Sequence, residues 1–289
     1  MPRNTVSNLS PAVSNISIIS TSGTSITLQA LVNITNPTPY QATIPYVNIH
    51  VVKNGSVLGQ ATAENLRVGL GNNTNLLVGA IWRPAAGGVE AAQIGRDLIS
   101  QYLSGYNVSV DIRVHPLSFP SAPLLSRALS GVNISVTAPR LSFPKTPGDG
   151  PDHGGDGDDG DDDVPDETAH FIRDATFHVF SSTATFTLVS PLHDKTLCIE
   201  GVNATALYNH TEPVGRITYA DPIKVPPGAS TTPKLPVDWS VGSVGYEAVR
   251  KALGGKLKLD ARANVSIRLG AFTERFWYEG QGIGANIRF

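Results

Sequence analysis

The chain has 289 residues, of which 16% are charged, and its 22 basic and 24 acidic residues leave a net charge of −2. This length is sufficient for two domains of ordinary size, each with its own hydrophobic core. The sequence contains no run of about 18 apolar residues, no basic and apolar signal peptide after Met1 and no cluster of Lys and Arg residues. We therefore expect no membrane anchor or targeting signal within these residues, and no nucleic-acid partner.

Short β-branched segments separated by turn residues dominate the first half of the chain. Residues 16–20 and 25–35 flank a Ser-Gly turn and predict a first hairpin. Residues 44–52 alternate between two faces with the period of two that is typical of a half-buried strand. Asn54-Gly55 then predicts a tight turn, since both central residues of a type I′ turn need a positive φ. In the returning strand, Gly59 indicates either a β-bulge or a close approach of another backbone.

Further strands and two helices complete this half. The remaining strands are predicted over residues 66–70, 75–82, 106–115 and 132–138. Between them the apolar residues change to a helical period over residues 91–104, and Gly105 ends this helix of about three turns. Residues 123–129 predict a shorter helix. The longer helix carries an apolar stripe that consists of Ile94, Leu98, Ile99, Tyr102 and Leu103.

An acidic segment separates the two halves. Residues 144–168 contain ten of the 24 acidic residues, one Lys, and otherwise mainly Gly and Pro. Such a segment cannot bury apolar surface and its charges repel, so we expect an extended, disordered linker. It does not fit a calcium-binding loop, because Val164 stands where Gly is needed and His170 where Glu is needed. The predicted domains are therefore residues 12–143 and 169–289.

The second half repeats the order of the first: strand, proline break, turn, glycine, helix and strand. Ser190-Pro191 takes the place of Asn36-Pro37, and a helix over residues 244–253 precedes a long strand over residues 256–269. The apolar stripe of this second helix consists of Val244, Val249, Ala252 and Leu253. Two copies of one architecture indicate an internal duplication. Periodicity favours a mainly β protein of two tandem antiparallel β-sandwiches, each with one or two short helices.

Ten Asn-x-Ser/Thr sequons occur, which is well above the number expected by chance. They favour a glycosylated domain on a luminal or extracellular side, although Asn and Ser/Thr are also common at strand ends and turns. Asn33 lies inside a predicted strand, and we do not expect it to be used. The candidate sites are Asn8, Asn15, Asn54, Asn72, Asn107, Asn133, Asn203, Asn209 and Asn264.

We find no pattern that predicts catalysis or cofactor binding. The sequence has no nucleophile elbow, no phosphate-binding loop and no dinucleotide fingerprint. Its seven His residues lack the spacing of metal ligands. The single Cys198 stands between Leu197 and Ile199, so we expect a buried structural thiol. We therefore expect a protein that is not an enzyme and has no cofactor and no metal.

The two helical stripes leave two interpretations open. In one, their apolar side chains are ordinary core residues. In the other, a helix and a sheet part far enough to admit an apolar ligand between them, and the stripes line one side of that groove.

Several of these segments carry a resemblance to a known family. A strand ending in Asn36-Pro37, a short strand, Asn54-Gly55 and Leu58-Gly59 resemble the late-embryogenesis-abundant group 2 domain, also called the water-stress and hypersensitive-response domain. Residues 262–289 resemble its closing hairpin. More closely, residues 32–141 are similar to a fungal domain of unknown function on the luminal side of vacuolar membrane proteins. That set includes the family implicated in terminating autophagosome formation.

The resemblance implies a fold and a function. Group 2 domains adopt a fibronectin/immunoglobulin-like sandwich with a helix, and their lysosomal and vacuolar relatives are proposed to hold lipid in a groove. The similar fungal proteins carry an N-terminal membrane anchor, which we do not find in this chain. Our hypothesis is a non-enzymatic luminal module at the vacuolar membrane that binds lipid between helix and sheet. Its expected partners are lipid or a membrane surface, and a protein at the vacuolar membrane. The alternative is a structural or adhesion-type module that binds protein or glycan through its loops.

Overall fold

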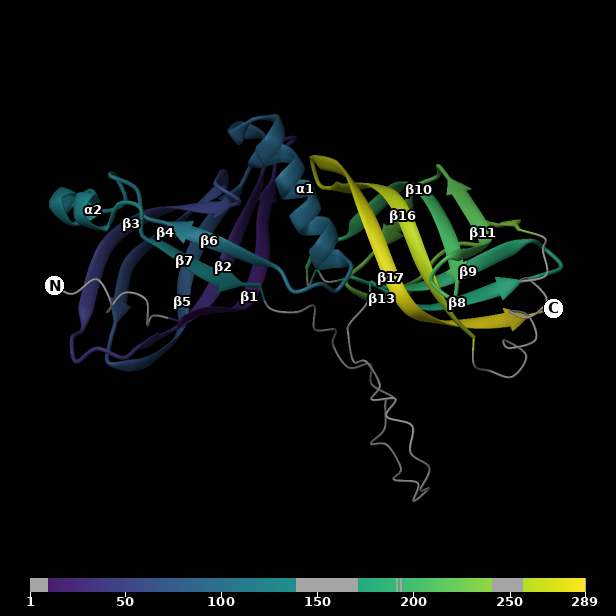
Figure 1. Cartoon of the computed structure of the whole chain (residues 1–289), viewed down its shortest axis with the longest axis horizontal. Helices are drawn as coiled ribbons and strands as arrows, with labels where there is room; N and C mark the ends of the chain where they lie inside the picture. Colours follow the sequence, from purple (N-terminus) through teal and green to yellow (C-terminus); the bar gives the residue numbers. More distant parts are fainter. Residues whose placement is uncertain (1–9, 139–170, 191, 193, 241–256, 289) are drawn as a thin grey trace, which may run out of the picture.

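A computed structural model describes residues 10–138, 171–190, 192, 194–240 and 257–288. Within these residues the protein is mainly β, and its strands form two curled sheets that lie next to each other along the long axis (Figure 1). The predicted linker over residues 144–168 and the predicted helix over residues 244–253 lie outside the described residues. No helix in the described part of the chain is long and apolar enough to cross a membrane.

The first sheet has seven antiparallel strands in the order β1-β2-β5-β4-β3-β6-β7. It curls so far that its two edge strands, β1 and β7, touch. The elements of this half are β1 (Ser10–Thr21), β2 (Ile26–Asn36), β3 (Ala42–Lys53), β4 (Ser56–Val68), β5 (Gly71–Trp82), η2 (Pro84–Gly87), α1 (Val89–Leu103), β6 (Ser109–Arg113), α2 (Pro123–Leu129) and β7 (Asn133–Thr137).

The second sheet has ten strands, of which eight follow the order β13-β9-β8-β17-β16-β10-β11-β15, while β12 pairs with β10 and β14 pairs with β9. The elements of this half are β8 (Ile172–His178), β9 (Thr183–Ser190), β10 (Leu197–Tyr208), β11 (Glu212–Tyr219), β12 (Ile223–Val225), β13 (Gly228–Thr231), β14 (Leu235–Pro236), β15 (Asp238–Trp239), β16 (Leu257–Leu269) and β17 (Phe272–Arg288).

Local sequence signals explain several of these elements. Asn54 and Gly55 have φ values of 49° and 84°, as the predicted turn between β3 and β4 requires. Both possibilities that the sequence left open for Gly59 are present: β4 bulges beside it, opposite Val51 and Val52, and the carbonyl oxygen of Ile81 lies so close that a Cβ atom would overlap it. The two helices predicted in the first half are confirmed as α1 and α2.

The sandwich architecture, in contrast, is not confirmed. The described strands of each half form one continuous curled sheet, not two sheets packed face to face. The pairing is also not wholly antiparallel, because β17 runs parallel to β8 over residues 284–288. The physical reason is that period-two alternation tells only that one face of a strand is buried. A sheet that curls on itself buries that face as well as a second sheet would.

Apolar clusters lie inside both sheets and between them. The inner face of the second sheet carries the larger cluster, which includes Leu197, Val225 and Leu259. A third cluster joins the halves: Ile26 of β2 packs with Phe272 and Phe276 of β17, and Ile99 of α1 packs against it. The two halves are therefore in direct apolar contact.

Candidate functional site

The second sheet encloses an apolar hollow on its concave side. Its volume is about 110 Å³, it is open on one side, and its walls come from most strands of the sheet and from the last residue of α1. No charged side chain lies among the residues that line it, which are Leu103, Phe171, Ile172, Phe186, Leu188, Leu197, Ile199, Val202, Ala204, Thr205, Ala206, Ile217, Ile223, Thr232, Leu235, Ala261, Ala263, Val265, Ile267, Phe276, Trp277 and Tyr278.

Small side chains at facing positions create this space. On neighbouring strands β10 and β16, Ala204 lies opposite Ala263, and Ala206 lies opposite Ala261. These four alanines occupy a patch where larger apolar residues would fill the concave side. The alternating pattern of β10 and β16 turns the alanines inward and the polar residues between them outward.

Two of the three hydroxyl groups at the walls, those of Thr232 and Tyr278, are engaged by the backbone around the hollow, and the third belongs to Thr205. The backbone N–H of Phe186 donates to Oγ1 of Thr232 at 3.0 Å, and the N–H of Ile172 donates to the hydroxyl of Tyr278 at 3.4 Å. Burial raises the pKa of Tyr278 far above its usual value, so its hydroxyl stays neutral. The hollow therefore offers a neutral and almost wholly apolar surface.

Helix α1 of the first half closes one side of the second domain by binding the free edge of β17. Hydroxyl oxygens of Ser100 and Ser104 accept hydrogen bonds from the backbone N–H groups of Trp277 and Glu279, at 3.1 and 2.9 Å. Both serines are buried. Their spacing suits the strand, because four helical residues rise about 6 Å and two strand residues about 6.6 Å.

Side chains add to this contact, which we call the α1–β17 seam. The indole N–H of Trp277 donates to Asp97 at 3.0 Å, and the hydroxyl of Tyr106 donates to the carboxylate of Glu279 at 3.3 Å. Arg96 and Glu274 form an ion pair at 3.7 Å. Trp277 is thus bound through both its backbone and its ring, while it also lines the hollow.

The predicted helical stripe is distributed over several environments. Leu103 lines the hollow, and Ile99 packs against the cluster between the two halves. Ile94, Leu98 and Tyr102 are half-buried and are not among the residues that line the hollow, and burial raises the pKa of Tyr102. The second stripe, consisting of Val244, Val249, Ala252 and Leu253, lies outside the described residues.

Sequence reasoning missed most of the residues around the hollow. The inward alanines of β10 and β16, and Phe276 and Tyr278 of β17, were not candidates. One signal could have pointed to them: each of two long alternating strands has small residues at the inward positions of its middle. That pattern becomes informative only when the two strands are known to be neighbours.

The sequon asparagines are mostly accessible. Among the nine that the structure describes, only Asn33 is half-buried, and its side-chain oxygen accepts a hydrogen bond from the N–H of Asn75 at 2.9 Å. The exposed ones are Asn15, Asn54, Asn72, Asn107, Asn133, Asn203, Asn209 and Asn264. Asn203 and Asn264 face each other on neighbouring strands. Asn8 lies outside the described residues.

The remaining candidates for chemistry are scattered. Cys198 is buried, as predicted for a structural thiol. In the first half, His50 and His115 stack with ring centroids 4.2 Å apart. In the second half, His210 pairs with Asp260. Over the described ranges, no group of three or more His, Cys, Asp or Glu residues could hold a metal ion.

Fold and site together define a protein of two β-rich domains in tandem, with an apolar hollow in the second. Residues 9–127 match the model of the Tag1-like fourth LEA-2 like domain, and residues 164–277 match that of the Tag1-like fifth LEA-2 like domain. The chain therefore belongs to the LEA-2-like domain family and carries two of its domains. These matches confirm the resemblance to the late-embryogenesis-abundant group 2 domain as a membership of that domain family. No curated protein matches the sequence.

Proposed function

We propose that this chain is a non-enzymatic module that binds the acyl chain of a lipid in the hollow of its second domain. The observation that carries the proposal is the lining, in which no residue is charged and the hydroxyls of Thr232 and Tyr278 already bond to the backbone. Burying a charge in such surroundings is costly. The part of the ligand inside must therefore be hydrocarbon, and a polar head group must remain outside.

The size of the hollow limits how much of a lipid it holds. Its volume of about 110 Å³ is close to that of an engineered apolar cavity of about 150 Å³ that stays dry and binds benzene. One chain end fits this space, and the rest of the chain would extend along the open side. Because Leu103 of α1 forms part of the wall, the ligand would lie between a helix and a sheet.

Native mass spectrometry of the full chain purified from eukaryotic cells tests the proposal. We expect a lipid adduct, and we expect organic extraction to release an acyl lipid. The double variant Ala204→Leu/Ala263→Leu fills the hollow from two facing positions and should remove the adduct without lowering the melting temperature. Thr218→Leu places a leucine at an exposed position of β11, outside the hollow, and should leave the adduct intact.

Two results would contradict lipid binding. One is a wild-type chain that carries no lipid and takes up no fluorescent fatty acid. The other is an adduct that persists unchanged in the double variant while Leu103→Asp also has no effect on it.

We further propose that the chain acts on the luminal side of the vacuolar membrane, in a family connected with autophagy. The sequons and the resemblance of residues 32–141 support this location. Expression through the secretory route, with an added targeting signal, should give a heterogeneous band that glycosidase collapses. Asn54→Gln should remove one glycan and Asn33→Gln none. A sharp band that glycosidase does not shift would contradict the luminal location.

The alternative remains a structural or adhesion-type module that binds protein or glycan through its loops. The α1–β17 seam favours it, because a tight contact between the domains would hold the loops of both in one arrangement. Under this alternative the double variant of the hollow changes stability alone and no lipid is bound.

A further inference from the structure

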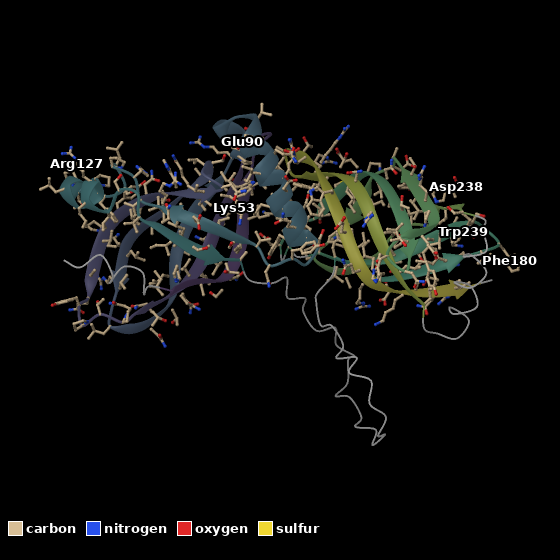
Figure 2. The ribbon with its side chains drawn as sticks, in the orientation of Figure 1. Lys53, Glu90, Arg127, Phe180, Asp238 and Trp239 are labelled. Atoms are coloured by element: carbon tan, nitrogen blue, oxygen red, sulfur yellow. The ribbon has the colours of Figure 1, made fainter. Side chains whose placement is uncertain are left out.

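The end of the first domain carries an unusual group of exposed leucines. Leu117 and Leu124 are 75% and 80% exposed, and Leu125 is 47% exposed. All three lie within nine residues, in the loop before α2 and in its first turns. We call this surface, together with Arg127, the α2 tip. Figures 1 and 2 show α2 and Arg127 at the end of the molecule that faces away from the second domain.

The leucines are exposed on a rigid support. Two serines without exposed surface, Ser118 and Ser126, hold the loop from inside. The hydroxyl of Ser118 accepts a hydrogen bond from the N–H of His115 at 2.8 Å. The backbone carbonyl of Ser118 accepts a second one from the N–H of Asn48 at 2.9 Å. The hydroxyl of Ser126 accepts from the N–H of Phe119 at 2.7 Å and donates to the carbonyl of the same residue at 3.1 Å. The loop therefore holds its apolar side chains in solvent without needing to order on binding.

The segment that forms the tip carries a charge of one sign. Residues 115–131 contain Arg127 and no Asp or Glu. Exposed leucines can enter the interfacial region of a bilayer, and a cation beside them adds attraction to anionic lipids. Helix α2 lies at the outer end of the first half (Figure 1), where a flat bilayer surface can reach it.

We propose that the α2 tip docks the protein on an anionic lipid bilayer, with Leu117, Leu124 and Leu125 in the interfacial region and Arg127 at the level of the lipid phosphates. The site is separate from the hollow of the second domain, and it does not depend on lipid binding there. The occupant is a bilayer surface, and a single lipid molecule would not bury the tip.

Vesicle sedimentation tests the tip with the full chain. We expect binding to vesicles of 70% phosphatidylcholine and 30% phosphatidylserine. Leu117→Ser/Leu124→Ser should lower the partition coefficient about tenfold or more, since each leucine loses apolar burial. Phe180→Ser is the matched control, because Phe180 is 84% exposed at the opposite end of the molecule, and it should change nothing (Figure 2). Arg127→Gln should weaken binding to the anionic vesicles about fivefold and have no effect on phosphatidylcholine alone.

A direct readout localises the contact. An environment-sensitive dye on Leu124→Cys should shift to the blue with vesicles, and the same dye on Phe180→Cys should not. The proposal is overturned if the wild-type chain does not bind the vesicles, if the serine variant binds as well as the wild type, or if the dye at position 180 shifts instead. Filling the hollow with Ala204→Leu/Ala263→Leu should leave vesicle binding unchanged, which separates the two sites.

Discussion

At the scale of single residues, Gly59 shows how the contact of two strands dictates a residue type. A Cβ atom at this position would overlap the carbonyl oxygen of Ile81 on β5, which belongs to the backbone and cannot move aside easily. By contrast, Gly23, in the turn between β1 and β2, has no atom within 4 Å of the position that a Cβ would take. Steric overlap therefore requires glycine at position 59 but not at position 23.

We expect Gly59→Ala to destabilise the first domain by about 1–3 kcal/mol, the range of overpacking substitutions. Gly23→Ala should change stability by less than about 0.5 kcal/mol. Urea unfolding of both variants measures the difference. Equal midpoints for the two variants would show that β4 and β5 separate freely at this point.

The stacked pair of His50 and His115 gives the first domain a pH dependence. Burial lowers the pKa of His50 below its usual value, and His115 and Arg113 lower it further. The folded state therefore binds this proton less tightly than the unfolded chain does. As the pH falls through about 6.5, the unfolded chain takes up the proton first, and the folded state loses stability.

We therefore expect the wild type to lose more unfolding free energy than His50→Gln between pH 7.5 and pH 5.5. Comparing the two chains cancels the contribution of the titrating groups that do not interact with His50. The measurement is the urea midpoint at both values of pH. A larger loss in the variant would give the opposite sign and would contradict the lowered pKa.

At the scale of elements, α1 covers a sheet edge that would otherwise be open. Strand β17 pairs with β8 only from residue 284 onward, so the N–H groups of Trp277 and Glu279 point away from β16 without a strand partner. Ser100 and Ser104 supply the missing acceptors. Open edges invite pairing with other chains, and the helix prevents this.

Removing either hydroxyl leaves a backbone N–H group without its partner. We expect Ser100→Ala and Ser104→Ala each to cost about 1–3 kcal/mol of unfolding free energy. Gln101→Ala, an exposed change on the same helix, should cost less than about 0.5 kcal/mol. Chemical denaturation measures the unfolding free energy of the three variants. A loss in Gln101→Ala equal to the loss in Ser100→Ala would argue against the seam.

At the scale of the whole molecule, the two halves share an interface although the sequence separates them by an acidic segment. The cluster of Ile26, Phe272 and Phe276 is apolar, and the α1–β17 seam beside it is polar. The hydroxyl of Thr21, at the end of β1, also accepts from the N–H of Ala271 in the turn between β16 and β17 at 3.1 Å. The first half thus contacts the β16–β17 hairpin at two places, through β1 at its turn and through α1 along β17.

Cleavage at a protease site inserted within residues 144–168 should leave two folded halves that still elute together as one species in size-exclusion chromatography. Ser100→Ala/Ser104→Ala should weaken this association and allow the halves to separate on dilution. Halves that separate at once from the cleaved wild-type chain would show that the interface does not hold in solution.

The sequence by itself determined the features that depend on near neighbours. Asn54-Gly55 sets its turn because positive φ is a property of those two residues, and α1 and α2 follow from helical period and a terminal glycine. Alternation identified many of the strands, although the single strand β4 was expected as two pieces. The strand and turn motifs identified the domain family. The exposure of most sequons also agrees with their position in turns and at strand surfaces.

Only the tertiary structure decided which surfaces meet. Alternation says that a face is buried but not what buries it, so one curled sheet could not be distinguished from two packed ones. The stripe of α1 predicted an apolar partner, but the partner was a strand more than 150 residues away in sequence. The hollow depends on Ala204 lying opposite Ala263. Such an alignment arises from the register of distant strands, which no local pattern encodes.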